Sequence, residues 1–482
     1  MTNALVHDKI KSEARGFQIH FDTLFFCKYN FRNRAYAGKG EESMYTKQDI
    51  LNLVEEEDVQ FIRLQFTDLS GQIKNVAITV SQLEKALENK ITFDGSAFDG
   101  FVSVEESDMY LYPILDTFAI FPWRPHQGKV ARLICDIYTA DRKPFAGDPR
   151  YILKKVMLEA YEMGFDCQVG PECEFYLFNT DDSGAPLAST NDEGGYFDVA
   201  PLDNGENCRR EIVLTLEDMD FEVEASHHES GRGQHEVVFG KDSALVTADR
   251  ITTFKMVVKT IAKRHGLHAT FMPKPLQTED GSALHLNFSL LQNGKNIFAE
   301  NGVLSDTAKS FIAGMLAHAR EISCLTNPTV NSYKRFLMQE KNCVNYLAWS
   351  EKNRSLAIRV PSDLENSARI EFRVPDLTCN PYFALAACIK AGLDGIRQGM
   401  QPPERVDHNP SVLSEEKRRE EGIDSMPYSL IEAIETARCS AFVRELLGDA
   451  LHARYLDAKQ REYEDYCRQI TQWELSHYLI RY

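Results

Sequence analysis

The sequence predicts an α+β protein in which a small N-terminal domain of strands precedes a larger domain whose sheet is backed by helices. Short alternating runs dominate residues 58–123, whereas the chain after residue 149 mixes strand and helix periods. Four runs in this second part alternate between apolar residues and charged or polar ones, as strands with one buried face do. A length of 482 residues suffices for two or three domains and a large core.

Residues 1–43 show no clear hydrophobic period, and we interpret them as an N-terminal extension or as the result of a start assigned too early. In the second case Met44 is the natural start. Thr46 and Asp49 stand three residues apart ahead of an apolar run, a pattern that predicts a capped helix. We therefore expect the first domain to cover residues 44–145.

Local patterns predict the elements of both domains in order. In the first domain we expect strands at 61–66, 73–78 and 130–137 and a short helix at 81–87. A stretch rich in Gly, Pro and Asp at 140–149 indicates the hinge to a second domain, 146–482. Helices are expected in that domain at 149–163, 251–265, 304–322, 382–396 and 430–468.

The first of the four alternating strands, residues 170–178, carries two acids. Glu172 and Glu174 are two residues apart, so both side chains point to the same face of the strand. Two carboxylates this close are costly unless a cation lies between them. An edge strand with both acids in water is the alternative interpretation.

The other three strands repeat this pattern and suggest a shared cavity. Their polar positions are Glu222, Glu224 and Ser226; His285, Asn287 and Ser289; and Arg369, Glu371 and Arg373. If the four strands pair in one sheet, helices cover one face and the other lines a charged cavity. Carboxylates with an imidazole are suitable ligands for Mg²⁺ or Mn²⁺, and arginines suit phosphate or carboxylate groups. Four unrelated amphipathic strands with solvated faces are the alternative.

Composition excludes several classes of function. The formal net charge of −18 argues against a nucleic acid or an anionic membrane as partner. No apolar run approaches the roughly 20 residues of a membrane span, and no signal-peptide pattern is present. The 11 cysteines form no CxxC pair, which is typical of reduced thiols and predicts a cytoplasmic protein.

From Met44 onward, several motifs carry a family resemblance. They are Asn207-Cys-Arg-Arg-Glu211, Ser226-His-His-Glu229, Gly233-Gln-His-Glu236, the run from Lys263 to Pro275, Asn327 to Arg335, Asn353-Arg-Ser355 and Asn380-Pro-Tyr382. Together they resemble the bacterial type I glutamine synthetases, and residues 1–43 lie outside the resemblance.

This resemblance implies a small N-terminal β-grasp domain and a large catalytic domain with a curved antiparallel sheet backed by helices. It also implies a dodecamer of two stacked hexameric rings, with active sites between neighbouring subunits. The expected reaction joins ammonia to glutamate with ATP, through γ-glutamyl phosphate, and yields glutamine, ADP and phosphate.

The resemblance further assigns residues to two divalent metal ions and to the substrates. Glu174, Glu229 and Glu236 match the ligands of one ion, and Glu172, His285 and Glu371 match those of the other. Matches at substrate glutamate are Gly281, Arg335 and Arg373; matches on the nucleotide side are Glu224, Ser289, Arg359 and Arg369. Arg354 matches the residue that faces the transferred phosphoryl group, and Asp94 matches the aspartate that binds ammonium across the subunit boundary. From the residues alone, Glu229 and Glu236 could also be solvated acids of a surface loop.

Three departures from the family pattern concern the glutamate and ammonia side. The flap motif Gly-Tyr-Glu-Ala-Pro is missing after Arg335, and Glu340 is the one candidate for its acid. The loop before His285 begins with Asp280 where the family has Asn, and Ala97 replaces a serine near Asp94. Two alternatives therefore stay open: a ligase for another amine, and a weakly active homologue that acts on a transcription regulator.

Overall fold

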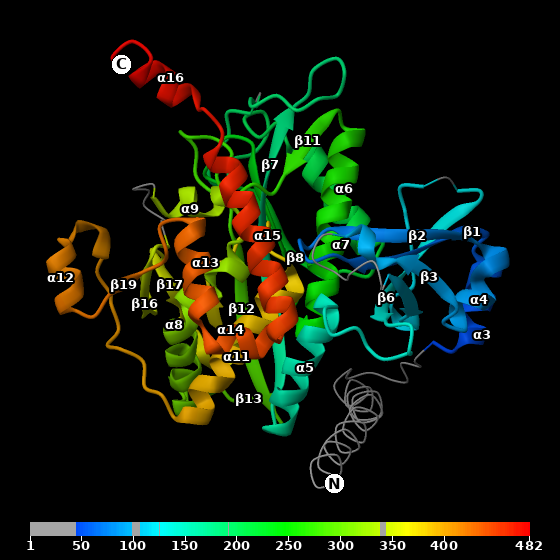
Figure 1. Cartoon of the computed structure of the whole chain (residues 1–482), viewed down its shortest axis with the longest axis horizontal. Helices are drawn as coiled ribbons and strands as arrows, with labels where there is room; N and C mark the ends of the chain where they lie inside the picture. The colour runs from blue at the N-terminus through cyan, green and yellow to red at the C-terminus, as the bar shows by residue number, and fades with distance from the viewer. Residues whose placement is uncertain (1–44, 99–106, 125, 191, 338–343) are drawn as a thin grey trace, which may run out of the picture. The chain divides into compact units, whose positions relative to one another are not determined.

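The computed structural model describes residues 45–98, 107–124, 126–190, 192–337 and 344–482 (Figure 1). Its first described helix, α3 (Lys47–Glu56), begins with the predicted capping box. The Asp49 carboxylate accepts a hydrogen bond from the Thr46 amide at 2.6 Å, and the Thr46 hydroxyl accepts one from the Asp49 amide at 3.2 Å. Glu340 lies outside the described residues, as do residues 1–43.

A small mixed sheet forms the core of the first domain. Its strands are β1 (Val59–Thr67), β2 (Ile73–Thr79), β3 (Ile91–Asp94), β4 (Asp108–Pro113), β5 (Ala119–Ile120) and β6 (Lys129–Tyr138). They lie in the order β2-β1-β6-β4-β3, with β5 paired to β6, and only the β1–β6 pair is parallel. The short helix α4 (Leu83–Leu87) covers this sheet with Leu83 and Leu87, which are buried. This arrangement agrees with the predicted strands and helix.

The second sheet is larger and carries the predicted polar strands. Its main strands lie in the order β19 (Asp424–Ser425), β16 (Tyr346–Ser350), β17 (Leu356–Arg359), β18 (Ile370–Phe372), β12 (Leu284–Gln292), β7 (Asp166–Asn179), β9 (Gln234–Phe239) and β8 (Val223–His228). The strands β10 (Asp242–Ser243) and β11 (Leu267–Thr270) pair with β7, and β13 (Lys295–Asn296) pairs with β12. All of these pairs are antiparallel except β16–β17. A separate hairpin joins β14 (Ala299–Glu300) and β15 (Val303–Leu304).

Three of the four predicted strands are direct neighbours in this sheet, and the fourth differs from the prediction. β9 lies between β7 and β8, so the strand near Glu224 does not pair with that of Glu172 and Glu174. In addition, β8 begins at Val223, and a shift in register between Val223 and Ala225 interrupts the strict alternation. Glu224 is consequently exposed.

Helices pack against the large sheet and against one another. They are α5 (Pro149–Glu162), α6 (Glu206–Glu217), α7 (Ala244–Arg264), α8 (Asp306–Thr326), α9 (Val330–Leu337), α10 (Leu364–Ser367), α11 (Pro381–Gln398), α12 (Glu415–Glu420), α13 (Leu430–Cys439), α14 (Ala441–Leu447), α15 (Asp449–Cys467) and α16 (Gln472–Tyr478). Both α5 and α7 contact β7, and α11 packs against α5 and α8 (Figure 1). The stretch 430–468, predicted as helical, is divided into three helices at Ser440 and Gly448.

A buried ionic network joins β6 to the helices α5, α7 and α11. The Arg150 guanidinium lies 2.7 Å from an Asp136 oxygen and donates two hydrogen bonds of 3.0 Å to the Asp249 carboxylate. Lys154 also pairs with Asp136, and the Tyr382 hydroxyl donates to Asp249 at 2.7 Å. All five side chains are buried, so each charge depends on its partners for solvation.

No helix in the described part of the chain combines the length and the apolar character that a membrane crossing requires. The nine cysteines of this part are free thiols, and seven of them are buried.

Candidate active site

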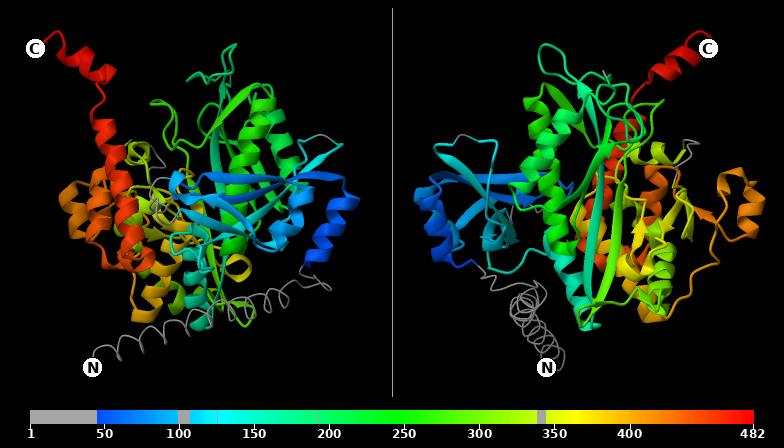
Figure 2. Two further views of the ribbon diagram at one scale, coloured as in Figure 1. Left: turned by 45° about the vertical axis from the view of Figure 1, so that its right-hand side comes forward. Right: turned by 180° about the vertical axis from the view of Figure 1, so that it is seen from behind.

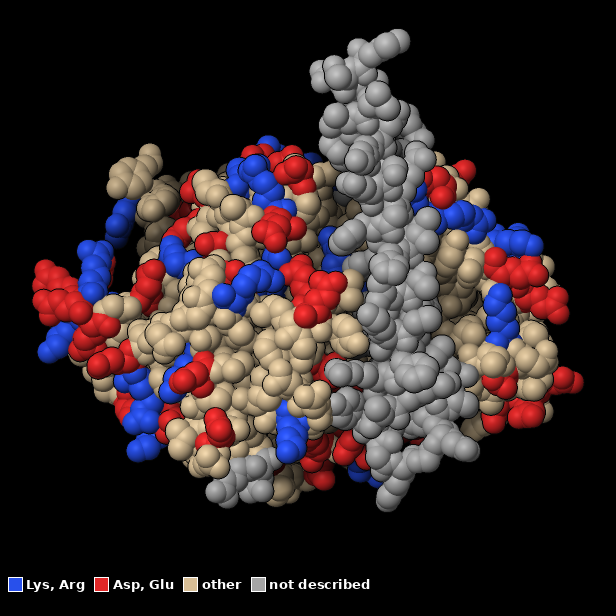
Figure 3. Space-filling model, turned by 90° about the horizontal axis from the view of Figure 1, so that it is seen from below, with Lys and Arg blue, Asp and Glu red and all other residues tan. Residues whose placement is uncertain are grey.

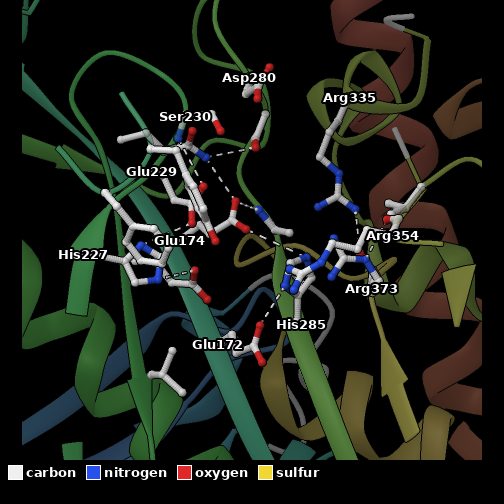
Figure 4. A pocket seen from close by; sticks show the side chains of 18 residues that line it. Glu172, Glu174, His227, Glu229, Ser230, Asp280, His285, Arg335, Arg354 and Arg373 are labelled. Atoms are coloured by element: carbon white, nitrogen blue, oxygen red, sulfur yellow. Dashed lines mark hydrogen bonds and ion pairs between the residues drawn. The ribbon is translucent and has the colours of Figure 1, made fainter. Parts of the chain in front are cut away.

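A cavity of about 650 Å³ opens on the polar face of the large sheet (Figure 4). Nine of the predicted site residues line it: Glu172, Glu174, Glu229, Glu236, Gly281, His285, Arg335, Arg354 and Arg373. In Figure 4 the three labelled arginines lie together on one side, and the acids Glu172, Glu174 and Glu229 lie opposite them. The cavity therefore separates a cation-binding half from an anion-binding half.

One cluster of potential metal ligands joins β7, β12 and β18. Glu172, His285 and Glu371 each offer a ligand atom, and these atoms lie within 4.8 Å of one another. Nδ1 of His285 is 3.1 Å from a Glu172 oxygen and 3.9 Å from a Glu371 oxygen. Burial alone would raise the pKa of Glu172, but hydrogen bonds from His285 and Asn287 lower it to about 2. The structure thus brings together three side chains that the sequence predicts as ligands of one ion.

A second cluster lies on β8, β9 and the turn between them. His227 is 3.4 Å from a Glu229 oxygen and 3.2 Å from a Glu236 oxygen. Glu174 is the cross-strand partner of Glu236, and one of its oxygens is 3.8 Å from Nε2 of His285, so it stands between the two clusters.

The electrostatics of this second cluster fit a bound cation. Burial and the neighbouring carboxylates raise the pKa of Glu174 to about 8 and that of Glu229 to about 9. Oε1 of Glu236 is buried and has no hydrogen-bond partner among the described residues. Three buried acids close to one another are a donor set suited to a divalent ion.

The loop before β12 is fixed by hydrogen bonds to its main-chain carbonyls. The Tyr176 hydroxyl donates to the carbonyl of Asp280, and Nε2 of Gln234 donates to that of Gly281 at 3.1 Å. A Cβ on Gly281 would lie 2.6 Å from Cγ of Arg335, so only glycine fits at this position. The absence of a side chain at Gly281 therefore allows the main chain to lie against Arg335, the arginine predicted to bind glutamate.

Two of the arginines are held by buried partners. Nη1 of Arg335 donates to the carbonyls of Ser282 and Pro375, both at 3.1 Å. Arg373 forms an ion pair with Glu371 and donates from Nε to the carbonyl of Arg354 at 3.1 Å. These contacts set the direction of each guanidinium before any ligand binds, which is how a rigid anion site is built.

The residues predicted on the nucleotide side divide into two groups. Ser289, Arg359 and Arg369 lie on β12, β17 and the start of β18. Arg359 forms an ion pair with Glu371, the Ser289 hydroxyl donates to the carbonyl of Ala368 at 3.2 Å, and Arg369 donates to the Asn287 amide oxygen at 2.9 Å. Glu224, exposed on β8, does not line the cavity.

Asp94 also lies away from the wall of this cavity. It ends β3 in the first domain, and its carboxylate accepts hydrogen bonds from the amide of Ser96 at 2.9 Å and from its hydroxyl at 2.6 Å. Its predicted role across a subunit boundary stays a prediction.

The sequence analysis missed six residues that line the cavity: Tyr196, Phe197, Ser230, Gln234, Val238 and Val344. The ring of Phe197 lies 4.6 Å from that of His227 and so extends the aromatic wall of the metal side. Two adjacent aromatics in a polar, glycine-rich segment were the available signal. Gln234 was visible only as part of a motif, without a role.

A sheet face with two sets of metal-ligating side chains beside three arginines defines an enzyme of metal-dependent phosphoryl transfer. Residues 58–140 match the family model for the glutamine synthetase β-grasp domain, and residues 146–478 match that for the glutamine synthetase catalytic domain. The chain belongs to the glutamine synthetase family.

Individual relatives agree with this assignment. The chain is 53% identical to a glutamine synthetase of Clostridium saccharobutylicum over 442 residues, which is 91% of this chain and 99% of the relative. It is 50% identical to one of Staphylococcus aureus over 443 residues, again 91% and 99%.

Solved structures show the same fold. A ligand-free structure of GmaS superposes with a TM-score of 0.80 and 31% sequence identity. The matched region covers 90% of this chain and 99% of the GmaS chain. The glutamine synthetase of Plasmodium falciparum covers 91% of this chain and 100% of its own, with a TM-score of 0.80 and 24% identity, and shows the fold alone.

These findings confirm the predicted family, the α+β fold with its β-grasp domain, and the class of enzyme. The chain is an ATP-dependent ligase that forms glutamine from glutamate and ammonia and depends on divalent metal ions.

Proposed function

We propose that the cavity of Figure 4 is where this reaction takes place and that the domains cover residues 44–145 and 146–482. The observation that carries the proposal is the meeting of two cation-binding clusters and three arginines on one sheet face. In the first step an oxygen of the glutamate side chain attacks the γ-phosphorus of ATP, and ADP leaves. In the second step ammonia attacks the acyl carbon, and phosphate leaves as a proton passes to a base.

Two divalent ions fit the donor sets of the cavity. Glu174, Glu229 and Glu236 would hold one ion, and Glu172, His285 and Glu371 the other. When bound, the ions supply positive charge that offsets the charge of the phosphates and of the transferred phosphoryl group. This assignment is supported by the buried, partnerless oxygen of Glu236 and by the distances within each cluster.

The residues of the chain divide the remaining tasks. Arg335, Arg373 and the backbone of Gly281 bind and orient glutamate, and Arg354 follows the charge of the transferred phosphoryl group. The nucleotide is contacted by Glu224, Ser289, Arg359 and Arg369. Asp94, supplied by a neighbouring subunit, binds ammonium, and Glu340 takes its proton.

A second candidate concerns the amine, and Asp280 is the observation that favours it. Asp280 lines the cavity, where its negative charge attracts a protonated amine. The same domains and metal clusters would then ligate glutamate to a primary amine in place of ammonia.

ADP release by the purified chain with Mg²⁺, ATP and glutamate tests both candidates. We expect turnover that saturates with ammonium and requires glutamate. Turnover with a primary amine and none with ammonium would replace the first candidate by the second. ADP release that is independent of glutamate and of every amine would contradict both.

We also propose a cytoplasmic dodecamer of two hexameric rings, without nucleic acid or membrane as partner. Its support is the C-terminal segment, where Ile470, Leu479 and Ile480 are 76%, 73% and 92% exposed. Both views of Figure 2 show α16 extending beyond α15. An apolar surface of this kind is typical of a contact between subunits.

On the face shown in Figure 3, acidic and basic side chains are interspersed, which suits neither an extended polyanion nor an anionic lipid surface.

Ending the chain at Arg468 is expected to reduce the size of this assembly, because the apolar segment is removed. Light scattering after size-exclusion chromatography measures the mass. Gln472→Ala, a polar change within the same segment, serves as control and should keep the mass of the full chain. An unchanged mass after truncation would contradict a role of this segment in assembly.

A further inference from the structure

Behind the second metal cluster lies a buried group of ionisable side chains to which the proposed reaction assigns no role. Asp192, Asp203, His228 and His235 each place a ligand atom within 4.8 Å of the others. All four are buried, and so is Arg209 beside them. Four such donors could hold a metal ion, so their hydrogen bonds decide what the group does.

His228 is fully engaged with acceptors. Its Nε2 lies 2.9 Å from an Asp192 oxygen, and its Nδ1 lies 2.6 Å from the carbonyl oxygen of Glu229. Since both partners accept, both ring nitrogens donate, and neither is available to a metal. His228 thus connects the Asp192 carboxylate to the main chain of Glu229.

Arg209, on α6, occupies the position that a metal ion would take near Asp203. Its Nη2 is 2.7 Å from an Asp203 oxygen, and its Nη1 is 2.8 Å from Nδ1 of His235. An arginine only donates, so Nδ1 of His235 accepts. The two acids of the group are therefore matched by two basic side chains, and no additional cation is required.

The strand pair β8–β9 places this group and the metal cluster on opposite faces. His228 pairs across the strands with His235, and His227 pairs with Glu236. Because neighbouring residues of a strand point to opposite faces, the two buried histidines face the group while Glu236 faces the cavity. Any shift of the histidines moves the backbone that carries Glu229 and Glu236.

The same group also fastens the segment 192–205. The Asp192 carboxylate accepts hydrogen bonds from the amides of Gly194 at 2.7 Å and Asn204 at 3.1 Å. A Cβ on Gly194 would lie 2.8 Å from Nε2 of His228, and one on Gly205 would lie 2.3 Å from Nε2 of His235. The segment thus lies directly on the two imidazoles, and it carries the cavity residues Tyr196 and Phe197.

We propose that Asp192, Asp203, Arg209, His228 and His235 form a positioning cluster for one of the two metal sites. The cluster holds the ends of β8 and β9 so that Glu229 and Glu236 converge on one ion, and it holds the aromatic wall beside them. This inference rests on the proposed function, because it takes Glu229 and Glu236 as metal ligands. The second site, at Glu172, His285 and Glu371, does not depend on it.

Titration of the full chain with Mn²⁺, followed by the EPR signal of the free ion, tests the cluster. Asp192→Ala is expected to weaken one of the two sites by about 10- to 100-fold and to leave the other unchanged, since outer partners of metal ligands have effects of this size. Asp192→Asn keeps an acceptor for His228 and should restore most of the affinity. Asp182→Ala, which changes an exposed acid in the loop before this segment, is the control and should change neither site.

Reference variants identify the affected site. Glu229→Gln should abolish Mn²⁺ binding at the site that Asp192→Ala weakens. The double variant should bind Mn²⁺ at the other site, at Glu172, His285 and Glu371, with the affinity of the parent chain. Arg209→Lys keeps the charge but loses the fork between Asp203 and His235, so it should weaken the same site even if Asp192→Ala fails to fold.

Three results would overturn the positioning role: equal weakening of both sites, no weakening in either variant, or a third bound ion that disappears with Asp192→Ala. A parent chain that binds fewer than two ions would instead contradict the proposed metal assignment itself.

Discussion

Changing Glu371 to Gln is expected to lower the rate of glutamate-dependent ADP formation, measured with ammonium, by about 10³-fold, or about 4 kcal/mol in the activation free energy. Glu371 is 1% exposed, and its two oxygens form ion pairs with Arg359 and Arg373. A glutamine has the same shape but no charge, so both arginines lose their common partner, and the ion proposed to bind beside His285 would lose one of its ligands.

Steady-state rates of ADP release measure this effect, and circular dichroism shows whether the fold is retained. Glu300→Gln makes the same chemical change at an exposed position on β14 and should leave the rate within twofold of the parent, as roughly expected for a surface site. A Glu371→Gln enzyme within about tenfold of the parent would show that the cluster is not needed for the reaction.

Arg150→Met is expected to reduce the free energy of unfolding by about 3–5 kcal/mol. The change removes the cation shared by Asp136 and Asp249 while both carboxylates stay buried at the junction of β6, α5 and α7. Lys154 still pairs with Asp136, but Asp249 keeps only the hydroxyl of Tyr382 among the contacts described above. Arg132, which is buried and interacts electrostatically with Asp249, then remains as a cation near this carboxylate, but the direct ion pair of Asp249 with Arg150 is lost, and such a loss in a protein core is costly.

Urea unfolding followed by circular dichroism measures the loss. Arg419→Met removes an exposed ion pair with Glu415 on α12 and is expected to have an effect of less than about 1 kcal/mol. If Arg150→Met also costs less than about 1 kcal/mol, water reaches the junction and the network is not buried in solution.

The strands that could be predicted were those whose two faces differ in chemistry. β7 and the segment from Arg369 to Val374 alternate between apolar and charged residues, so the strand period was visible and the polar faces that carry Glu172, Glu174 and Glu371 followed from it. His285 was found in the same way, as a polar position of an alternating strand. The pairing of β7 with β12 then brought these residues together.

β9 could not be predicted because both of its faces are buried. One face carries His235, whose partner Arg209 is remote in sequence and in turn pairs with Asp203, so no local period marks the position. The irregularity in β8 was not visible either, since residues 221–226 alternate strictly in sequence while the strand shifts its register between Val223 and Ala225.

The division of residues 430–468 into three helices was missed for a different reason. The Ser440 hydroxyl accepts a hydrogen bond from the amide of Val443 at 3.1 Å, and Gly448 adopts a φ of 78°. Both features are signals of helix ends, but the residues between them, Ala441 to Leu447, are also compatible with one continuous helix. The helical period over residues 430–468 therefore led to the prediction of one helical stretch, although Ser440 and Gly448 are local signals of helix ends.

The loop that carries Asp280 has a consequence for how specificity can evolve. Tyr176, Gln234 and Arg335 all hold this loop through main-chain carbonyls, at Asp280, Gly281 and Ser282. Its conformation is therefore encoded by residues other than the one at position 280. A single codon change at this position can alter the charge that an incoming amine meets while the hydrogen bonds that hold the loop are kept. Selection for a different amine substrate can therefore proceed in single substitutions.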